Sequence, residues 1–129
     1  MTHSAVIFTN GLHMTWEFAP NKCMLPEGIE EGDEQIVQLY AIVYHYSVGM
    51  FACYMDLDGV KIVNQSDDKL PLHITLYTGV DIDNREIPPV EAGILLKSMK
   101  FPLSKGVTPS DYSPLNEVRS WKGKWGFLP

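Results

Sequence analysis

The sequence has few cysteines and no long apolar run. Only Cys23 and Cys53 occur among its 129 residues, and they show no CxxC spacing, so the chain lacks the cysteine framework of a small secreted protein. We interpret both as reduced thiols in an apolar core, with a single disulfide as the alternative. No window approaches the roughly 18 apolar residues of a membrane-spanning helix, and the first residues lack the features of a secretion signal. These absences predict a cytoplasmic protein with no membrane partner.

Positive charge is also scarce. Ten Lys and Arg face 16 Asp and Glu, which gives a formal net charge of −6. Binding to long duplex nucleic acid depends on clustered Lys and Arg, so we exclude that class of partner, whereas a local basic site for a small ligand stays open. No low-complexity segment or solenoid repeat is present. With 45% hydrophobic residues, residues 1–129 are expected to form a single globular domain.

Alternation of apolar and polar residues, bounded by turn residues, predicts antiparallel strands. Residues 4–9 and 12–18 flank the turn pair Asn10-Gly11 and predict an opening hairpin. Residues 20–32 are rich in Pro, Gly and Glu and predict a loop. Further strands are predicted at 40–55 (two or three strands), 60–63 and 71–77.

Two helices and an irregular tail complete the expected organisation. Asp33 is in position to cap a short helix through Gln35, Ile36 and Leu39. A longer helix is predicted to start at Pro88-Pro89, with an apolar stripe of Val90, Ile94, Leu95 and Met99. Residues 101–129 contain four prolines and three glycines, which predicts a loop-rich tail with one strand near 117–121.

One short pattern occurs twice. LHMTW at 12–16 and LHITL at 72–76 share an apolar residue, His, an apolar residue, Thr and an apolar residue, 60 positions apart. On a strand, the His and Thr of each motif lie on one face while the apolar residues face the core. Two such strands side by side would present two imidazoles and two hydroxyls to one pocket. A neutral imidazole can accept a proton and a protonated one can donate it, while hydroxyls hold phosphate oxygens, so the pattern predicts phosphodiester cleavage without a metal ion.

The paired HxT motifs, with a predicted helix after the second, resemble the two-histidine (2H) phosphoesterase superfamily. The nearest likeness is to its 2′,3′-cyclic nucleotide 3′-phosphodiesterase branch: HITL at 73–76 followed by PVEAGILL at 89–96, and the late pair Gly123-Lys124, are similar to that branch. The resemblance covers the whole chain. It implies an α+β fold in which two pseudo-symmetric halves of antiparallel strands form a cleft, with helices outside.

The resemblance also implies an activity. Water would open a 2′,3′-cyclic phosphate on a nucleotide or RNA end, with His13 and His73 as acid and base in either order, Thr15 and Thr75 binding the phosphate, and no metal or organic cofactor. A second possibility is the degradation of cyclic di- or oligonucleotide immune signals, as in some viral and phage members of the superfamily. A third is a module that binds a nucleotide or single strand without reaction.

Three more residues are candidate substrate contacts. Alternation predicts that Tyr77 shares the face of His73, where it can stack or donate a hydrogen bond. Trp121 and Lys124 belong to an aromatic and basic stretch that suits a base and a phosphate. The alternative is that the tryptophans of this stretch pack the tail onto the sheet.

The remaining histidines are interpreted as structural. His45 and Ser47 form a third, partial match, which we interpret as an ordinary strand histidine. His3 is interpreted as a solvent-exposed bystander near the N-terminus. A zinc site built from His13, His45, His73 and Cys53 is disfavoured, because these residues lack the close spacing of zinc ligands.

Overall fold

The computed structural model describes residues 2–19, 22–45, 48–64, 71–80, 83–88, 93–94 and 112–129. Its regular elements are seven strands, paired antiparallel throughout. In chain order they are β1 (Thr2–Ile7), β2 (His13–Ala19), β3 (Glu34–His45), β4 (Val48–Leu57), β5 (Val60–Ile62), β6 (His73–Thr78) and β7 (Tyr112–Leu128). The described part of the chain contains no helix that is long and apolar enough to cross a membrane.

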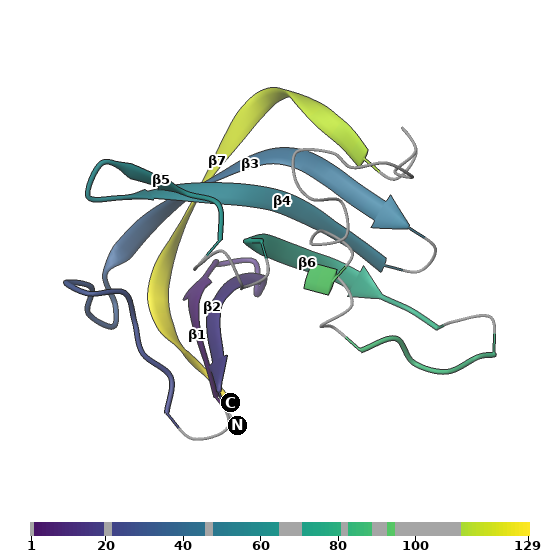
Figure 1. Ribbon diagram of the computed structural model, residues 1–129, viewed down its shortest axis with the longest axis horizontal. Helices are drawn as coiled ribbons and strands as arrows, with labels where there is room; N and C mark the ends of the chain where they lie inside the picture. The colour runs from purple at the N-terminus through teal and green to yellow at the C-terminus, as the bar shows by residue number, and fades with distance from the viewer. Residues whose placement is uncertain are drawn as a thin grey trace.

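Six of the strands form a closed ring. The pairing order is β3-β7-β1-β2-β6-β4, and β4 pairs again with β3, so that the sheet closes into a small barrel (Figure 1). The short strand β5 adds to the end of β4 as a hairpin. Closure places the first and last strands side by side, with His3 opposite Leu128. The two chain ends therefore lie together (Figure 1).

The predicted α+β fold is wrong. The described chain forms one antiparallel sheet with no outer helices, and this sheet is a single ring rather than two halves around a cleft. The short helix predicted after Asp33 is instead the start of β3, where Val37 and Leu39 are buried and their neighbours are less so. This is period-two burial, and it outweighs the capping signal because it fills the core. The Asp33 carboxylate accepts a hydrogen bond from the Glu30 N–H, within a turn.

The predicted loop-rich tail is also corrected, although the one strand predicted in it, near 117–121, is confirmed as part of β7. β7 runs through 17 residues and pairs with both β1 and β3. The glycines that indicated a loop serve packing instead: a Cβ at Gly123 would lie 2.7 Å from Cγ1 of Val6 and 2.8 Å from the carbonyl oxygen of Ile7. Most of the helix predicted after Pro88, at 89–92 and 95–100, lies outside the described residues, as does 101–111.

The hairpin and turn predictions are confirmed. β1 and β2 pair across the turn at Asn10-Gly11, where Gly11 has a φ of 86° and the Asn10 side chain accepts a hydrogen bond from the Leu12 N–H. β4 and β5 are joined in the same way by Asp58-Gly59, both with positive φ. No strand forms in the described part of the predicted loop, 22–32.

The barrel interior holds the main core. Fully buried side chains from six strands fill it: Val6, Met14, Val37, Leu39, Cys53, Met55, Ile74 and Trp125. A second buried cluster, on the outer face of β3 and β4, contains Ala41, Val43, Val48, Met50 and Ala52. The change of face follows from a bulge at Tyr40, because Leu39 is opposite Cys53 whereas Ala41 is opposite Ala52. Both cysteines are buried and neither forms a disulfide, as predicted.

Truncation of Ile74 tests the interior packing. Because its side chain is fully buried, we expect Ile74→Ala to lower the free energy of unfolding by about 2–5 kcal/mol, measured by urea denaturation. Ile36→Ala is the matched control, since Ile36 is 43% exposed on β3 and its truncation removes little buried surface. Equal losses in the two variants would contradict the assigned core.

Candidate functional site

The structure brings the two HxT motifs onto neighbouring strands. β2 and β6 pair antiparallel with Met14 opposite Ile74. In such a pair the flanking residues face each other crosswise, so that His13 lies beside Thr75 and Thr15 beside His73. Met14 and Ile74 point into the core with no exposed surface. The two histidines and two threonines therefore share the outer face of the sheet, where all four are partly buried.

Small and apolar residues border this group on both sides. On β1, Ala5 is paired with Thr15 and Ile7 with His13. On β4, Met50 is paired with Thr75 and Ala52 with His73. Ala5, Met50 and Ala52 have no exposed surface. The imidazoles thus lie in an apolar surrounding that disfavours their charged form.

His73 is held in one orientation by the backbone. Its Nδ1 lies 2.8 Å from the carbonyl oxygen of Pro71. Because a carbonyl oxygen only accepts, Nδ1 carries the hydrogen, and in the neutral ring Nε2 is left to accept a proton. Burial lowers the pKa of His73, the bond to Pro71 opposes this shift, and His13 reinforces it. The arrangement favours a neutral imidazole, which is the form a general base needs.

His13 has a second imidazole as neighbour on the other side. Burial, followed by the charge of His3, lowers the pKa of His13. The rings of His3 and His13 have centroids 6.3 Å apart, and the ring of His3 packs on Phe18 at 4.6 Å. His3 is partly buried, so its interpretation as a solvent-exposed bystander is corrected. The strand was predicted to start at Ser4, one residue too late to assign His3 to a face.

Tyr77 does not share the face of His73 as alternation predicted. β6 and β4 are out of register at one point: Thr75 is opposite Met50, but Tyr77 is opposite Gly49. Since Met50 and Gly49 are consecutive, Thr75 and Tyr77 lie on opposite faces, with Leu76 as the extra residue of a bulge. The Tyr77 ring lies over Gly49, where any Cβ would clash with it. Sequence alternation cannot reveal such a bulge.

The two predicted tail contacts are separated. Trp121 packs edge-on against Phe8 and Phe51, with centroids at 5.4 Å in both cases, and so belongs to the core as the alternative interpretation held. Lys124 is exposed and paired with Ile7, which in turn is paired with His13. Lys124 therefore lies on the HxT face, two strands away from His13.

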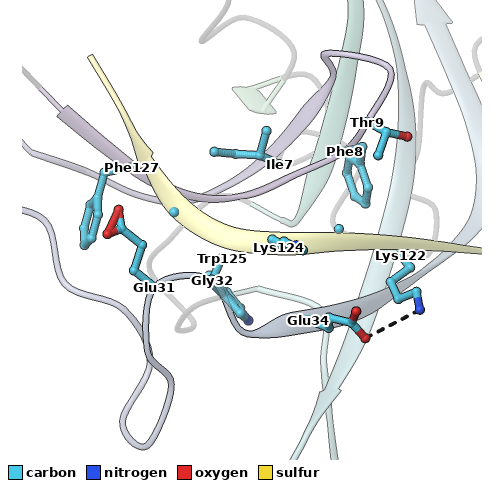
Figure 2. A pocket seen from close by; sticks show the side chains of 12 residues that line it. Ile7, Phe8, Thr9, Glu31, Gly32, Glu34, Lys122, Lys124, Trp125 and Phe127 are labelled. Carbon is cyan, nitrogen blue, oxygen red and sulfur yellow. Dashed lines mark ion pairs between the residues drawn. The ribbon is translucent and has the colours of Figure 1, made fainter.

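Lys124 also lines an open hollow of about 570 Å³ along β7 (Figure 2). At one end of this hollow Lys122 and Glu34 form an exposed ion pair at 3.5 Å, and Phe127 lies at the other end. The remaining lining residues include Ile7, Phe8, Thr9, Glu31 and Trp125. Among the described residues, neither HxT motif contributes to this hollow; Lys124 and the neighbouring Ile7 connect it to the HxT face.

The disfavoured zinc set is not assembled. Cys53 lies in the barrel interior, on the opposite side of the sheet from the HxT residues, and burial raises the pKa of its thiol far above the ordinary value. His45 is on β3, opposite Val48. Among the residues that the structure describes, no group of three or more His, Cys, Asp or Glu side chains has the arrangement of a metal site.

The chain has no detectable relatives in three comparisons: no protein-family model matches it, and neither the curated proteins nor the solved structures include a significant match.

The lowered histidine pKa values predict a pH-dependent stability. Both histidines bind protons less readily in the folded protein than in the unfolded chain, whose ordinary pKa is 6.5. Their contribution to stability is complete above this pH and is lost as the pH falls through the folded values. We expect the melting temperature to decrease between pH 7.5 and 5.5. A His13→Gln, His73→Gln double variant should show a smaller decrease, and an unchanged decrease would refute the assignment.

Proposed function

We propose that this protein hydrolyses a 2′,3′-cyclic phosphodiester on a nucleotide or RNA end, without a metal ion, in the cytoplasm. The observation that supports this best is the register of β2 and β6, with Met14 opposite Ile74. It gathers two imidazoles and two hydroxyls on one face, from segments 60 positions apart in the sequence. This set supplies the proton acceptor, the proton donor and the phosphate ligands that the reaction requires. The function is that of the 2H phosphoesterases that the motifs resemble.

His73 is the proposed general base. Its Nδ1 is engaged by the Pro71 carbonyl, so Nε2 takes the proton from water while the water oxygen attacks phosphorus. The lowered pKa of His73 keeps the ring neutral before the reaction. Thr15, its cross-strand neighbour, and Thr75 on its own strand donate hydrogen bonds to non-bridging phosphate oxygens.

His13 is the proposed general acid. As the new P–O bond forms, one of the two ribose P–O bonds breaks, and protonated His13 gives its proton to the departing ribose oxygen. The products are one phosphomonoester, which keeps the second hydrogen of the water, and one free hydroxyl, whose proton comes from His13. His73 is left protonated and His13 neutral, and proton exchange with solvent restores both. The negative phosphate favours the protonated form of His13, since an adjacent opposite charge raises an imidazole pKa. Lys124 adds positive charge from the same face.

Loss of either histidine should abolish turnover. Removing an acid or base costs about 10²–10⁴ in rate, so we expect His13→Ala and His73→Ala to lose at least about 100-fold in kcat on a mononucleoside 2′,3′-cyclic phosphate with EDTA present. Thr15→Ala and Thr75→Ala should lose about tenfold, as for one hydrogen bond to a charged group.

The controls are His45→Ala, on β3, and Thr9→Ala, in the exposed turn between β1 and β2. Both variants should retain full activity. Near-normal rates in both motif-histidine variants would contradict the proposal. Turnover of a cyclic dinucleotide but not of the mononucleotide would favour the signal-degrading alternative. Binding of both nucleotides without turnover would favour the binding module.

The pH dependence of the reaction rate should differ between the free enzyme and its complex with substrate. The profile of kcat/KM reports the free enzyme and that of kcat the complex. Both histidine pKa values are lowered in the free protein, so kcat/KM should peak on the acid side of pH 6.5. A bound phosphate raises both pKa values, so kcat should peak at a higher pH. Two coincident profiles, or a kcat that is independent of pH from 5 to 8 or so, would argue against paired imidazoles.

A further inference from the structure

His3 joins the HxT residues by leaning across the sheet. On β1, His3 is opposite Phe18 of β2, and Ile7 is opposite His13 of β2. The pair Ala5 and Thr15 lies between these two pairs. Four positions along a strand span about 13 Å, yet the two imidazole centroids are only 6.3 Å apart. Both rings must therefore incline toward each other over the Ala5–Thr15 pair.

Thr15 therefore shares its face of the sheet with three imidazoles. His73 lies beside it across β2 and β6, as the register of Met14 and Ile74 requires. His3 and His13 approach it from the two ends of β1 and β2. Ala5, the small residue paired with Thr15, has no exposed surface. The register therefore gathers one hydroxyl and three imidazole rings on this face of the sheet.

One of these nitrogens has no partner. Nδ1 of His3 is buried and makes no hydrogen bond within the described structure. A buried polar atom without a partner is costly, and native proteins leave few of them. The Phe18 ring holds the His3 ring in this position at 4.6 Å. A ligand oxygen would satisfy the atom.

The charges around the group favour an anion. On this face of β1, β2 and β6, the described residues include no acidic side chain. Glu17 is paired with Ser4 on the opposite face, where its Oε1 accepts a hydrogen bond from the Met24 N–H. On β7, Leu128 is opposite His3, and Lys124 follows on the same face beyond Ile7. In a chain with a net charge of −6, this is a local surplus of basic groups.

We infer that His3 is a third histidine of the site, and that its Nδ1–H donates a hydrogen bond to a phosphate oxygen held over Thr15. The inference rests on the proposed function for its ligand class, a phosphodiester substrate and its phosphomonoester product. His3 does not transfer a proton to the reacting atoms. It binds the phosphate and adds positive charge beside His13. The site is therefore built to hold a phosphate group even where no bond is broken.

Binding of inorganic phosphate tests this separately from turnover. The probe is phosphate titrated at pH 6.0, followed by the histidine ring proton signals in NMR. His3→Phe keeps the ring that packs on Phe18 but removes both nitrogens. We expect it to weaken phosphate binding about tenfold, the loss for one charge-assisted hydrogen bond, and to shift the titration of His13 to higher pH. His45→Phe, the same change on β3, should bind as the unaltered protein does. If His3→Phe unfolds, His3→Gln is used instead, and the amide donor should retain part of the affinity.

The outcomes distinguish the two proposals. Unchanged phosphate affinity and an unchanged His13 titration in a folded His3 variant would overturn the role of His3 and leave the proposed function standing. Phosphate binding that depends on His3, together with no turnover of any cyclic phosphate, would support the site and refute the hydrolase. Absence of phosphate binding in the unaltered protein would overturn the role of His3, and the turnover assay would then decide the hydrolase by itself.

Discussion

The arrangement of the whole site depends on the pairing of Met14 with Ile74. β1–β2 and β4–β6 are extended ladders, and this contact joins them and closes the ring. Both side chains are fully buried in the barrel, so the hydrophobic effect that stabilises the interior also fixes the register. A slip of one strand by one residue would turn its core residue outward and its histidine inward, so that the two histidines would no longer share a face. The core thus determines which side chains meet on the outer face.

The same packing sets the protonation of the site. Apolar neighbours on β1 and β4 bury the imidazoles, and the imidazoles repel one another when charged. Both effects favour neutral rings in the unoccupied protein. A phosphate, the ligand proposed for this face, would have the opposite effect, because its negative charge stabilises an imidazolium. Neutral rings before binding and a charged ring after it suit acid–base catalysis on a phosphodiester better than a permanently charged site would.

Bulges decide which residues accompany the motifs. The extra residue Trp16 in β2 lets Phe18 share a face with His3, and the extra residue Leu76 in β6 moves Tyr77 to the opposite face from Thr75. A third bulge, at Tyr40, separates the interior core from the outer cluster of β3 and β4. Each inserts one residue into one strand and thereby inverts the alternation beyond it. Candidates chosen by period-two counting are therefore reliable only up to the next bulge.

The sequence by itself determined the strands of the two motifs and the Asn10-Gly11 hairpin. It also divided residues 12–16 and 72–76 into a core face and a polar face. These features follow from local alternation and turn chemistry. Only the tertiary structure decided that residues 34–39 are a strand and that the strand predicted near 117–121 extends over 112–128, since their conformation is set by the ring they complete rather than by their caps, prolines and glycines. It likewise placed Trp121 in the core and brought His3 to His13. These are contacts between distant segments, which no local pattern encodes.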